Sequence, residues 1–209
     1  MRDQTISEYL SQLADRVPAP GGGAAAALHA AQGAALLGMV ARYTTGEKYA
    51  EHRDAVERII ARTDTVRSAA LRVGEEDAAA FTAVIDAYRL PKGERAEAVA
   101  HALAGAARPP AEVVGLARAV VELATELLPI GNRNVITDIA AATEAARAAA
   151  TTAPARPPAT TARINVEINL GGIKDEALRA ELTAVIATVD DIADRAARLT
   201  DAVRLEIAP

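Results

Sequence analysis

Asp77 is the residue whose position points most directly to chemistry, because it interrupts an apolar helix face. The members of that face follow one another by three or four residues: Val56, Ile60, Thr63, Val66, Ala70, Val73, Asp77, Phe81, Val84 and Tyr88. Burying a carboxylate is costly unless it is paired or neutralised, so we expect a raised pKa for Asp77. Such a carboxyl group can act as a general acid or base near neutral pH. A cap for a helix that restarts after Gly74, or a structural ion pair, would explain the same pattern.

The segment GNRNVITD, residues 131–138, is a second candidate. Asn132 and Asn134 place side-chain amides beside the free N–H groups at the start of a helix, where the helix dipole is positive. Asp138 follows about one turn into that helix. Helix capping explains either asparagine, but hardly both together with the acid, so a binding role and a capping role both stay open.

Two further polar motifs could contact a ligand. Gly21, Gly22 and Gly23 precede an alanine-rich helix, where small residues let a ligand approach backbone N–H groups closely. No strand precedes them, which excludes a dinucleotide-binding fingerprint, and a purely structural turn remains the alternative. Asn165 and Asn169 are four residues apart and share one side of a helix or strand. They could line a polar pocket or satisfy nearby backbone groups.

The elements that must position these residues are predicted to be helices throughout. Alanine, the best helix former, accounts for 53 of the 209 residues. Helices are expected over residues 5–16, 24–43, 47–88, 94–107, 110–128, 135–150 and 175–205. The first has Ile6, Leu10, Leu13 and Val17 on one side, and the last carries a heptad seam for a long helix or a dimer partner. Residues 1–209 read as one domain, with a proline-rich loop at 151–161.

Composition excludes several classes of protein. The chain has no cysteine, which removes disulfide scaffolds and thiolate metal sites, and no two of its three histidines have metal-ligand spacing. Five aromatic residues and a net charge of −5 disfavour nucleic-acid binding. The charged N-terminus is no secretory signal, and residues 23–41 favour a buried central helix over a membrane span. We therefore expect a soluble cytoplasmic protein.

Five segments appear together in a recognisable order: PAPGGGAAAA, TTGEKY, EEDAAAF with RLPK after it, GNRNVITD, and NVEINL followed by Asp175. Together they resemble the cyclodeaminase/cyclohydrolase family. That family includes the C-terminal domain of formiminotransferase-cyclodeaminase and free-standing methenyltetrahydrofolate cyclohydrolases. The resemblance covers roughly residues 6–205. The chain departs from the family at Ala24, where serine is frequent, and in retaining only Lys48 of a lysine cluster.

The resemblance implies an all-α bundle of long antiparallel helices that forms a homodimer with a folate-sized cleft. It implies a tetrahydrofolate derivative as substrate, with no metal and no bound prosthetic group. Asp77 matches the proposed active-site acid, and Asp138 would be a second acid–base or polar group. The remaining matched positions would bind substrate: Gly21, Gly22, Gly23, Lys48, Tyr49, Asn132, Asn134, Asn165 and Asn169.

Three functions therefore stand as hypotheses. The leading one is hydrolysis of 5,10-methenyltetrahydrofolate, or the related formimino cyclodeamination. The second is the same scaffold acting on a different amine or amidine in specialised metabolism. The third is a helical dimerisation module without catalytic activity.

Overall fold

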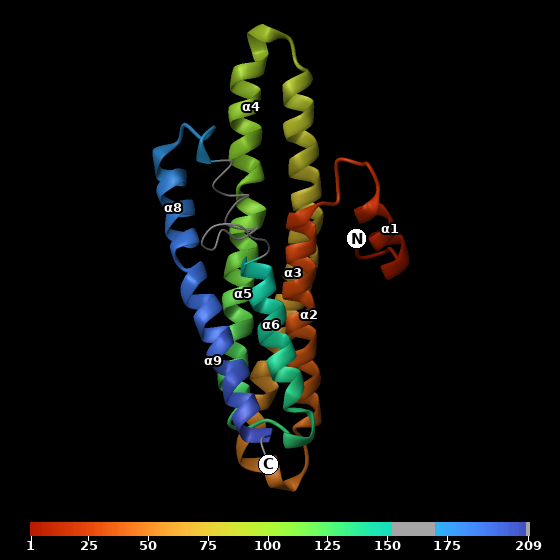
Figure 1. Ribbon diagram of the computed structural model, residues 1–209, viewed down its shortest axis with the longest axis vertical. Helices are drawn as coiled ribbons and strands as arrows, with labels where there is room; N and C mark the ends of the chain where they lie inside the picture. The colour runs from red at the N-terminus through yellow and green to blue at the C-terminus, as the bar shows by residue number, and fades with distance from the viewer. Residues whose placement is uncertain (152–169, 208–209) are drawn as a thin grey trace.

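The computed structural model describes residues 1–151 and 170–207, and within these ranges it consists of helices with no strands. This confirms the all-α prediction (Figure 1). In chain order the elements are α1 (Ile6–Ala14), α2 (Gly22–Tyr43), the short 3-10 helix η1 (Glu47–His52), α3 (Arg53–Arg89), α4 (Lys92–Ala106), α5 (Arg108–Leu127), the 3-10 turn η2 (Arg133–Val135), α6 (Thr137–Thr151), α8 (Glu176–Ala187) and α9 (Val189–Ile207).

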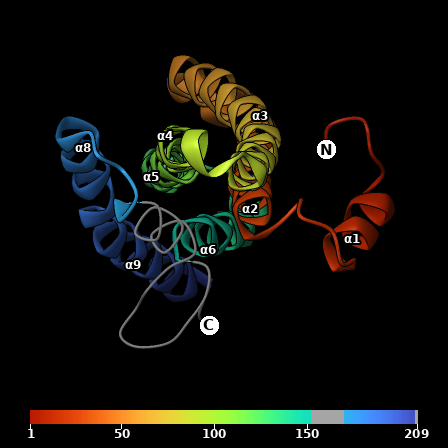
Figure 2. The same cartoon turned by 90° about the horizontal axis from the view of Figure 1, so that it is seen from above.

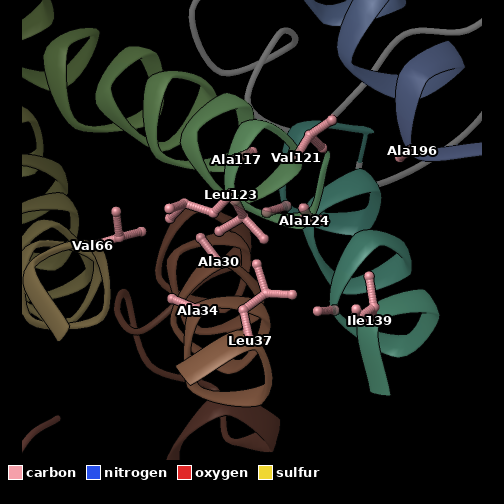
Figure 3. Packing of buried hydrophobic residues seen from close by; sticks show 14 of the residues in the cluster. Ala30, Ala34, Leu37, Val66, Ala117, Val121, Leu123, Ala124, Ile139 and Ala196 are labelled. Atoms are coloured by element: carbon pink, nitrogen blue, oxygen red, sulfur yellow. The ribbon is translucent and has the colours of Figure 1, made fainter. Parts of the chain in front are cut away.

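Helix α2 is the centre of the bundle and packs against α3, α5 and α6. Its alanines allow this close approach, and Ala30, Ala34 and Leu37 are fully buried (Figure 3). A Cβ atom at Gly33 would lie 2.9 Å from the backbone oxygen of Ala142 on α6, so glycine is required where these two helices meet. Burial of this helix agrees with the prediction of a central core helix.

α2 is also the one described helix that is long and apolar enough to cross a membrane. Its most apolar 18-residue stretch is 61% buried inside the bundle, as expected for the core helix of a soluble protein.

Helix α3 runs without interruption for 37 residues. It is buried against α2 and α5 as far as Gly74, and its C-terminal part forms a long hairpin with α4 (Figure 1). The hypothesis that Asp77 caps a helix restarting after Gly74 is therefore wrong, because Gly74 lies inside a continuous helix. The predicted apolar face continues in space beyond Asp77, but Phe81 and Tyr88 are exposed, since little of the bundle extends alongside them.

The predicted helix over residues 175–205 is divided into α8 and α9 at Thr188. The Thr188 hydroxyl donates to the Val185 carbonyl, and both helices contact α5. α8 contributes to a small separate core with residues near the start of α5, whereas α9 packs mainly against α6. Val185, a heptad position, is partly buried against the main core, and Ile186 is buried in the small separate core. The prediction of one continuous helix over residues 175–205 was therefore wrong at Thr188.

Helix α1 stands beside the bundle (Figure 2). A capping box at its start confirms the predicted helix: the Thr5 hydroxyl accepts from the Glu8 N–H, and the Glu8 carboxylate accepts from the Thr5 N–H. Its predicted apolar side is largely uncovered, with Ile6 78% and Leu10 52% exposed. Tyr9, three residues after Ile6 and four before Leu13 at the edge of this apolar side, is the buried residue of α1.

Candidate active site

The Asp77 carboxyl group lies over the N-terminus of α2. Its atoms fill the space that a Cβ atom at Gly23 would occupy, so any side chain at residue 23 would overlap them. The backbone N–H of Ala24 donates a hydrogen bond to the carboxylate. Gly21, the N-cap residue of α2, has no side chain to perform this role. Asp77 therefore caps α2 from a neighbouring helix.

Two opposing influences act on the ionisation of Asp77. Burial raises the pKa of its carboxyl group, and the hydrogen bond from the Ala24 N–H lowers it, with burial the stronger of the two. The positive end of the α2 dipole also favours the carboxylate form. A half-buried carboxyl group with a raised pKa and one fixed donor can exchange a proton with a bound molecule.

This carboxyl group faces a pocket of about 490 Å³ between the PAPGGG turn, α3 and α4. Among the described residues that line it, Asp77 is the only one whose side chain is ordinarily charged at neutral pH. The other lining residues are small, apolar or aromatic: Pro18, Ala19, Gly21, Gly22, Gly23, Phe81, Val84, Tyr88, Leu103 and Ala106. The pocket thus offers aromatic and aliphatic surfaces around one acid, as a flat heterocyclic ligand requires.

Gly21, Gly22 and Gly23 are thus brought together with Asp77, as the predicted site requires. The predicted apolar face supplies Phe81, Val84 and Tyr88 to the same pocket, although these residues are not part of the core. The α4 residues Leu103 and Ala106 complete one wall. Sequence periodicity does not reveal them, because their contribution depends on how the α3–α4 hairpin closes.

A second group of predicted residues lies at the other end of α2. The Asn132 side chain donates to the Tyr43 carbonyl at 2.7 Å, and the Asn132 N–H donates to the Thr44 hydroxyl at 3.0 Å. The Asn132 side-chain oxygen accepts from the Asn134 N–H at 3.1 Å. Asn132 therefore joins the turn before α6 to the end of α2, which is a structural role that capping accounts for.

The other predicted residues at this end are the half-buried Tyr49 and Asp138 and the exposed Lys48. Lys48 lies over the Tyr49 ring, 4.7 Å from its centroid, and Tyr49 lines a separate pocket of about 590 Å³. Asp138 is half-buried in the first turn of α6, and its side chain makes no hydrogen bond or ion pair with another described residue. Asn165 and Asn169 lie outside the described residues.

One chain does not bring the two groups together. The 22 residues of α2 separate them by about 30 Å, at 1.5 Å per residue. Lys48, Tyr49, Asn132, Asn134 and Asp138 could meet the Asp77 pocket only as residues of a second copy. No three Asp, Glu or His side chains within residues 1–151 and 170–207 are arranged to hold a metal ion.

Tyr9 belongs to the surroundings of Asp77 and was not predicted. It is 4% exposed, and the negative charge of Asp77 adds to the effect of burial in raising the pKa of the Tyr9 hydroxyl. The apolar stripe of α1 directed attention to Ile6 and Leu10 instead. The sequence signal was weak: Tyr9 is simply the one aromatic residue in an otherwise aliphatic and polar helix.

Comparison with known proteins identifies the family. A family model described as formiminotransferase-cyclodeaminase matches residues 5–188. The chain belongs to the formiminotransferase-cyclodeaminase family. It is 34% identical over 186 residues to the methenyltetrahydrofolate cyclohydrolase of Methylorubrum extorquens, covering 86% of this chain and 85% of that protein.

Two further relatives define how the family scaffold is shared. The pig formimidoyltransferase-cyclodeaminase is 30% identical over 191 residues, which are 88% of this chain but 34% of that longer protein. The crystal structure of formiminotetrahydrofolate cyclodeaminase from Thermotoga maritima superposes with a TM-score of 0.82 at 26% identity, covering 97% of this chain and 98% of that one. The cyclodeaminase-like fold is therefore shared over nearly the whole chain.

Proposed function

We propose that this family member hydrolyses 5,10-methenyltetrahydrofolate to a formyltetrahydrofolate, with Asp77 as the general acid and base. The observation that carries the proposal is the Asp77 carboxyl group, half-buried in a pocket of suitable size at the N-terminus of α2. The similarity to a methenyltetrahydrofolate cyclohydrolase along 85% of that protein supports this substrate class.

Hydrolysis needs two proton movements that one carboxyl group can perform. Water adds to the amidinium carbon while the Asp77 carboxylate accepts one of its protons. The bond from this carbon to one folate nitrogen then breaks, and Asp77 returns the proton to that nitrogen. The remaining hydroxyl proton is released to solvent as the formyl C=O forms. A raised pKa suits both steps, because the group must bind and release a proton near neutral pH.

Formimino cyclodeamination is the second candidate, and the same acid supports it. A folate nitrogen attacks the carbon of the protonated formimino group and gives its own proton to the Asp77 carboxylate. Asp77 passes this proton to the amino nitrogen, the bond between that nitrogen and the carbon breaks, and ammonia leaves. The similarity to a formiminotetrahydrofolate cyclodeaminase of nearly equal chain length favours this candidate. We place hydrolysis first because the methenyltetrahydrofolate cyclohydrolase is the more similar of the two, at 34% identity against 26%. The chain spans about a third of the length of the pig relative.

The test follows loss of methenyltetrahydrofolate absorbance with the wild-type protein, Asp77→Asn and Asp86→Asn. Asp86 is the matched control, because it lies on the same helix, is exposed and pairs with Arg89. We expect Asp77→Asn to lower kcat by about 100-fold or more, as for loss of a general acid–base group, and Asp86→Asn to stay within about two-fold.

Equal rates for the wild type and Asp77→Asn would remove the catalytic role of Asp77. A wild-type protein that accelerates neither folate reaction and binds no folate in calorimetry would favour another amine or amidine substrate. A protein that no small molecule stabilises, and that Asp77→Leu stabilises, would fit a dimerisation module.

We further propose that the chain forms one domain, that two chains form a homodimer, and that the protein acts in the cytoplasm. The uncovered apolar side of α1, with Ile6 and Leu10, and the exposed Phe81 and Tyr88 beside the Asp77 pocket support a second chain at this face. In such a homodimer, the predicted residues at the far end of α2 in one chain could approach the Asp77 pocket of the other chain.

A further inference from the structure

The Tyr9 hydroxyl is a buried polar group without a hydrogen-bond partner among the described residues. Tyr9 as a whole is 4% exposed, so solvent does not reach the hydroxyl in the structure. A buried hydroxyl group nearly always has a partner, because leaving it unpaired costs the full desolvation of the group. The unpaired hydroxyl therefore points to a hydrogen-bond partner that Tyr9 gains in another arrangement of the site.

The position of Tyr9 connects it to Asp77. Tyr9 lines a pocket of about 380 Å³ together with Ala24, whose N–H donates to the Asp77 carboxylate, and Ala78, the next residue along α3. Ala19 lines both this pocket and the Asp77 pocket, so the two lie next to each other. The effect of the Asp77 charge on Tyr9 agrees with this proximity.

Two contacts of the residues before Tyr9 fix the start of α1 and attach it to α3. The capping box of Thr5 and Glu8 fixes the start of α1 one turn before it. Arg2 forms an ion pair with Glu75 of α3 at 2.6 Å, two residues before Asp77. This pair lowers the pKa of Glu75 to about 2, so Glu75 stays charged and the attachment persists at neutral pH.

We propose that Tyr9 is a positioning residue for Asp77, and that its hydroxyl donates to the carboxylate in an arrangement that the substrate-free protein also adopts and that substrate binding favours. A carboxylate has about four acceptor positions and the Ala24 N–H fills one, so Tyr9 can be a second donor while another position faces the substrate. Two donors fix the plane of the carboxyl group, which a single donor leaves free to rotate. This inference rests on the proposed function, in that Asp77 is the proton-transfer group.

The other charged and titratable groups near this contact are few. Tyr88 of α3 lies in the Asp77 pocket, and Glu75 with the N-terminal amino group lies in the Tyr9 pocket. α2 contributes the N–H groups of its first turn, and the α4 residues that line the Asp77 pocket are apolar. A change in the titration of Asp77 on removal of the Tyr9 hydroxyl is therefore attributable to that hydroxyl.

The test compares the wild-type protein, Tyr9→Phe and Tyr43→Phe. Tyr9→Phe removes one unpaired oxygen and keeps the ring, so we expect an unchanged or higher Tm. We expect kcat for methenyltetrahydrofolate to fall by about ten-fold, as for loss of a charge-assisted hydrogen bond, with KM unchanged. Tyr43→Phe is the matched control, because Tyr43 is 59% exposed at the far end of α2.

A second measurement does not depend on catalysis. Carbon-13 NMR of aspartate carboxyl groups, with the Asp77 signal assigned by its absence in Asp77→Asn, gives the titration of Asp77 directly. Loss of a donor to the charged form should move the midpoint of Asp77 to higher pH in Tyr9→Phe and leave it unchanged in Tyr43→Phe.

The outcomes separate this inference from the proposed function. A shifted Asp77 midpoint in a protein without folate activity supports the Tyr9–Asp77 contact and contradicts the proposed substrate. An unchanged midpoint overturns the inference whatever the activity. A shifted midpoint with kcat within two-fold of an active wild type also overturns it, because the contact then has no catalytic effect.

Discussion

The ionisation of Asp77 connects the stability of the protein to pH as well as to catalysis. Burial raises the pKa of this carboxyl group above its ordinary value of 3.8 in the folded state. Above about pH 4 the folded state therefore binds more protons at this group than the unfolded state does. The free energy of unfolding consequently decreases as the pH rises from 3.8 through the raised pKa of Asp77. At pH values above that pKa, the full cost of burying the charged carboxylate remains.

Asp77→Asn should remove this penalty, since asparagine does not ionise and its side-chain oxygen can still accept from the Ala24 N–H. We expect the variant to exceed the wild type in unfolding free energy by more at pH 7 than at pH 4. Urea unfolding at the two pH values measures the difference. Asp86→Asn serves as the control, with the same small effect at both values. A gain for Asp77→Asn that does not change with pH would show that burial does not dominate the ionisation of Asp77.

At the scale of elements, the site exists because the N-terminus of α2 meets the middle of α3. Gly23 makes this contact possible, since the Asp77 carboxyl group fills the space beside its Cα atom. The Arg2–Glu75 ion pair then attaches α1 to the same part of α3. Three helices that are consecutive in the sequence thereby contribute a backbone donor, an acid and a buried hydroxyl group.

Gly23→Ala should displace the carboxyl group of Asp77. Because Asp77 lies on a rigid helix, we expect a loss of about 1–3 kcal/mol in unfolding free energy, as for overpacking of a filled site, together with a strong fall in kcat. Gly115→Ala is the control: no atom lies within 4 Å of a Cβ at Gly115 in α5. There alanine should stabilise the helix by about 0.5–1 kcal/mol. Thermal unfolding and absorbance assays measure both effects, and a Gly23→Ala protein with wild-type kcat would contradict the placement of Asp77.

At the scale of the whole molecule, the described chain leaves apolar side chains uncovered around the mouth of the Asp77 pocket. Phe81 and Tyr88 of α3 line the pocket, Val17 directly precedes the PAPGGG turn, and Leu10 lies on α1. Soluble proteins seldom expose such a group without a partner surface. This distribution is the physical basis for the proposed homodimer.

Light scattering should therefore give a mass twice that of the 21.6 kDa chain. The double variant Ile6→Glu, Leu10→Glu places charges on the uncovered side of α1 and should shift the protein toward the monomer. Leu205→Glu is the control, because Leu205 is 79% exposed at the other end of the molecule. A wild-type monomer, or a dimer unaffected by the double variant, would contradict this assignment of the interface.

Local patterns in the sequence were sufficient to predict most of the helices and the half-buried position of Asp77. Helix propensity and the positions of glycine and proline act over a few residues, so they predict where helices begin and end. The apolar face of α3 placed Asp77 correctly against its neighbours as far as the bundle extends. The family resemblance, which rests on short motifs in order, was confirmed as well.

Tertiary structure decided which predicted faces are covered and which predicted residues meet. Periodicity shows that Ile6 and Leu10 share a side of α1, but Tyr9 is the residue that the bundle buries. The predicted last helix is divided at Thr188, where α8 belongs to a small separate core and α9 packs mainly against α6. Long-range packing also places Asp77 beside the glycines and Asn132 a full helix length away. Such distances depend on how 22 residues of α2 lie in the bundle, which no local spacing specifies.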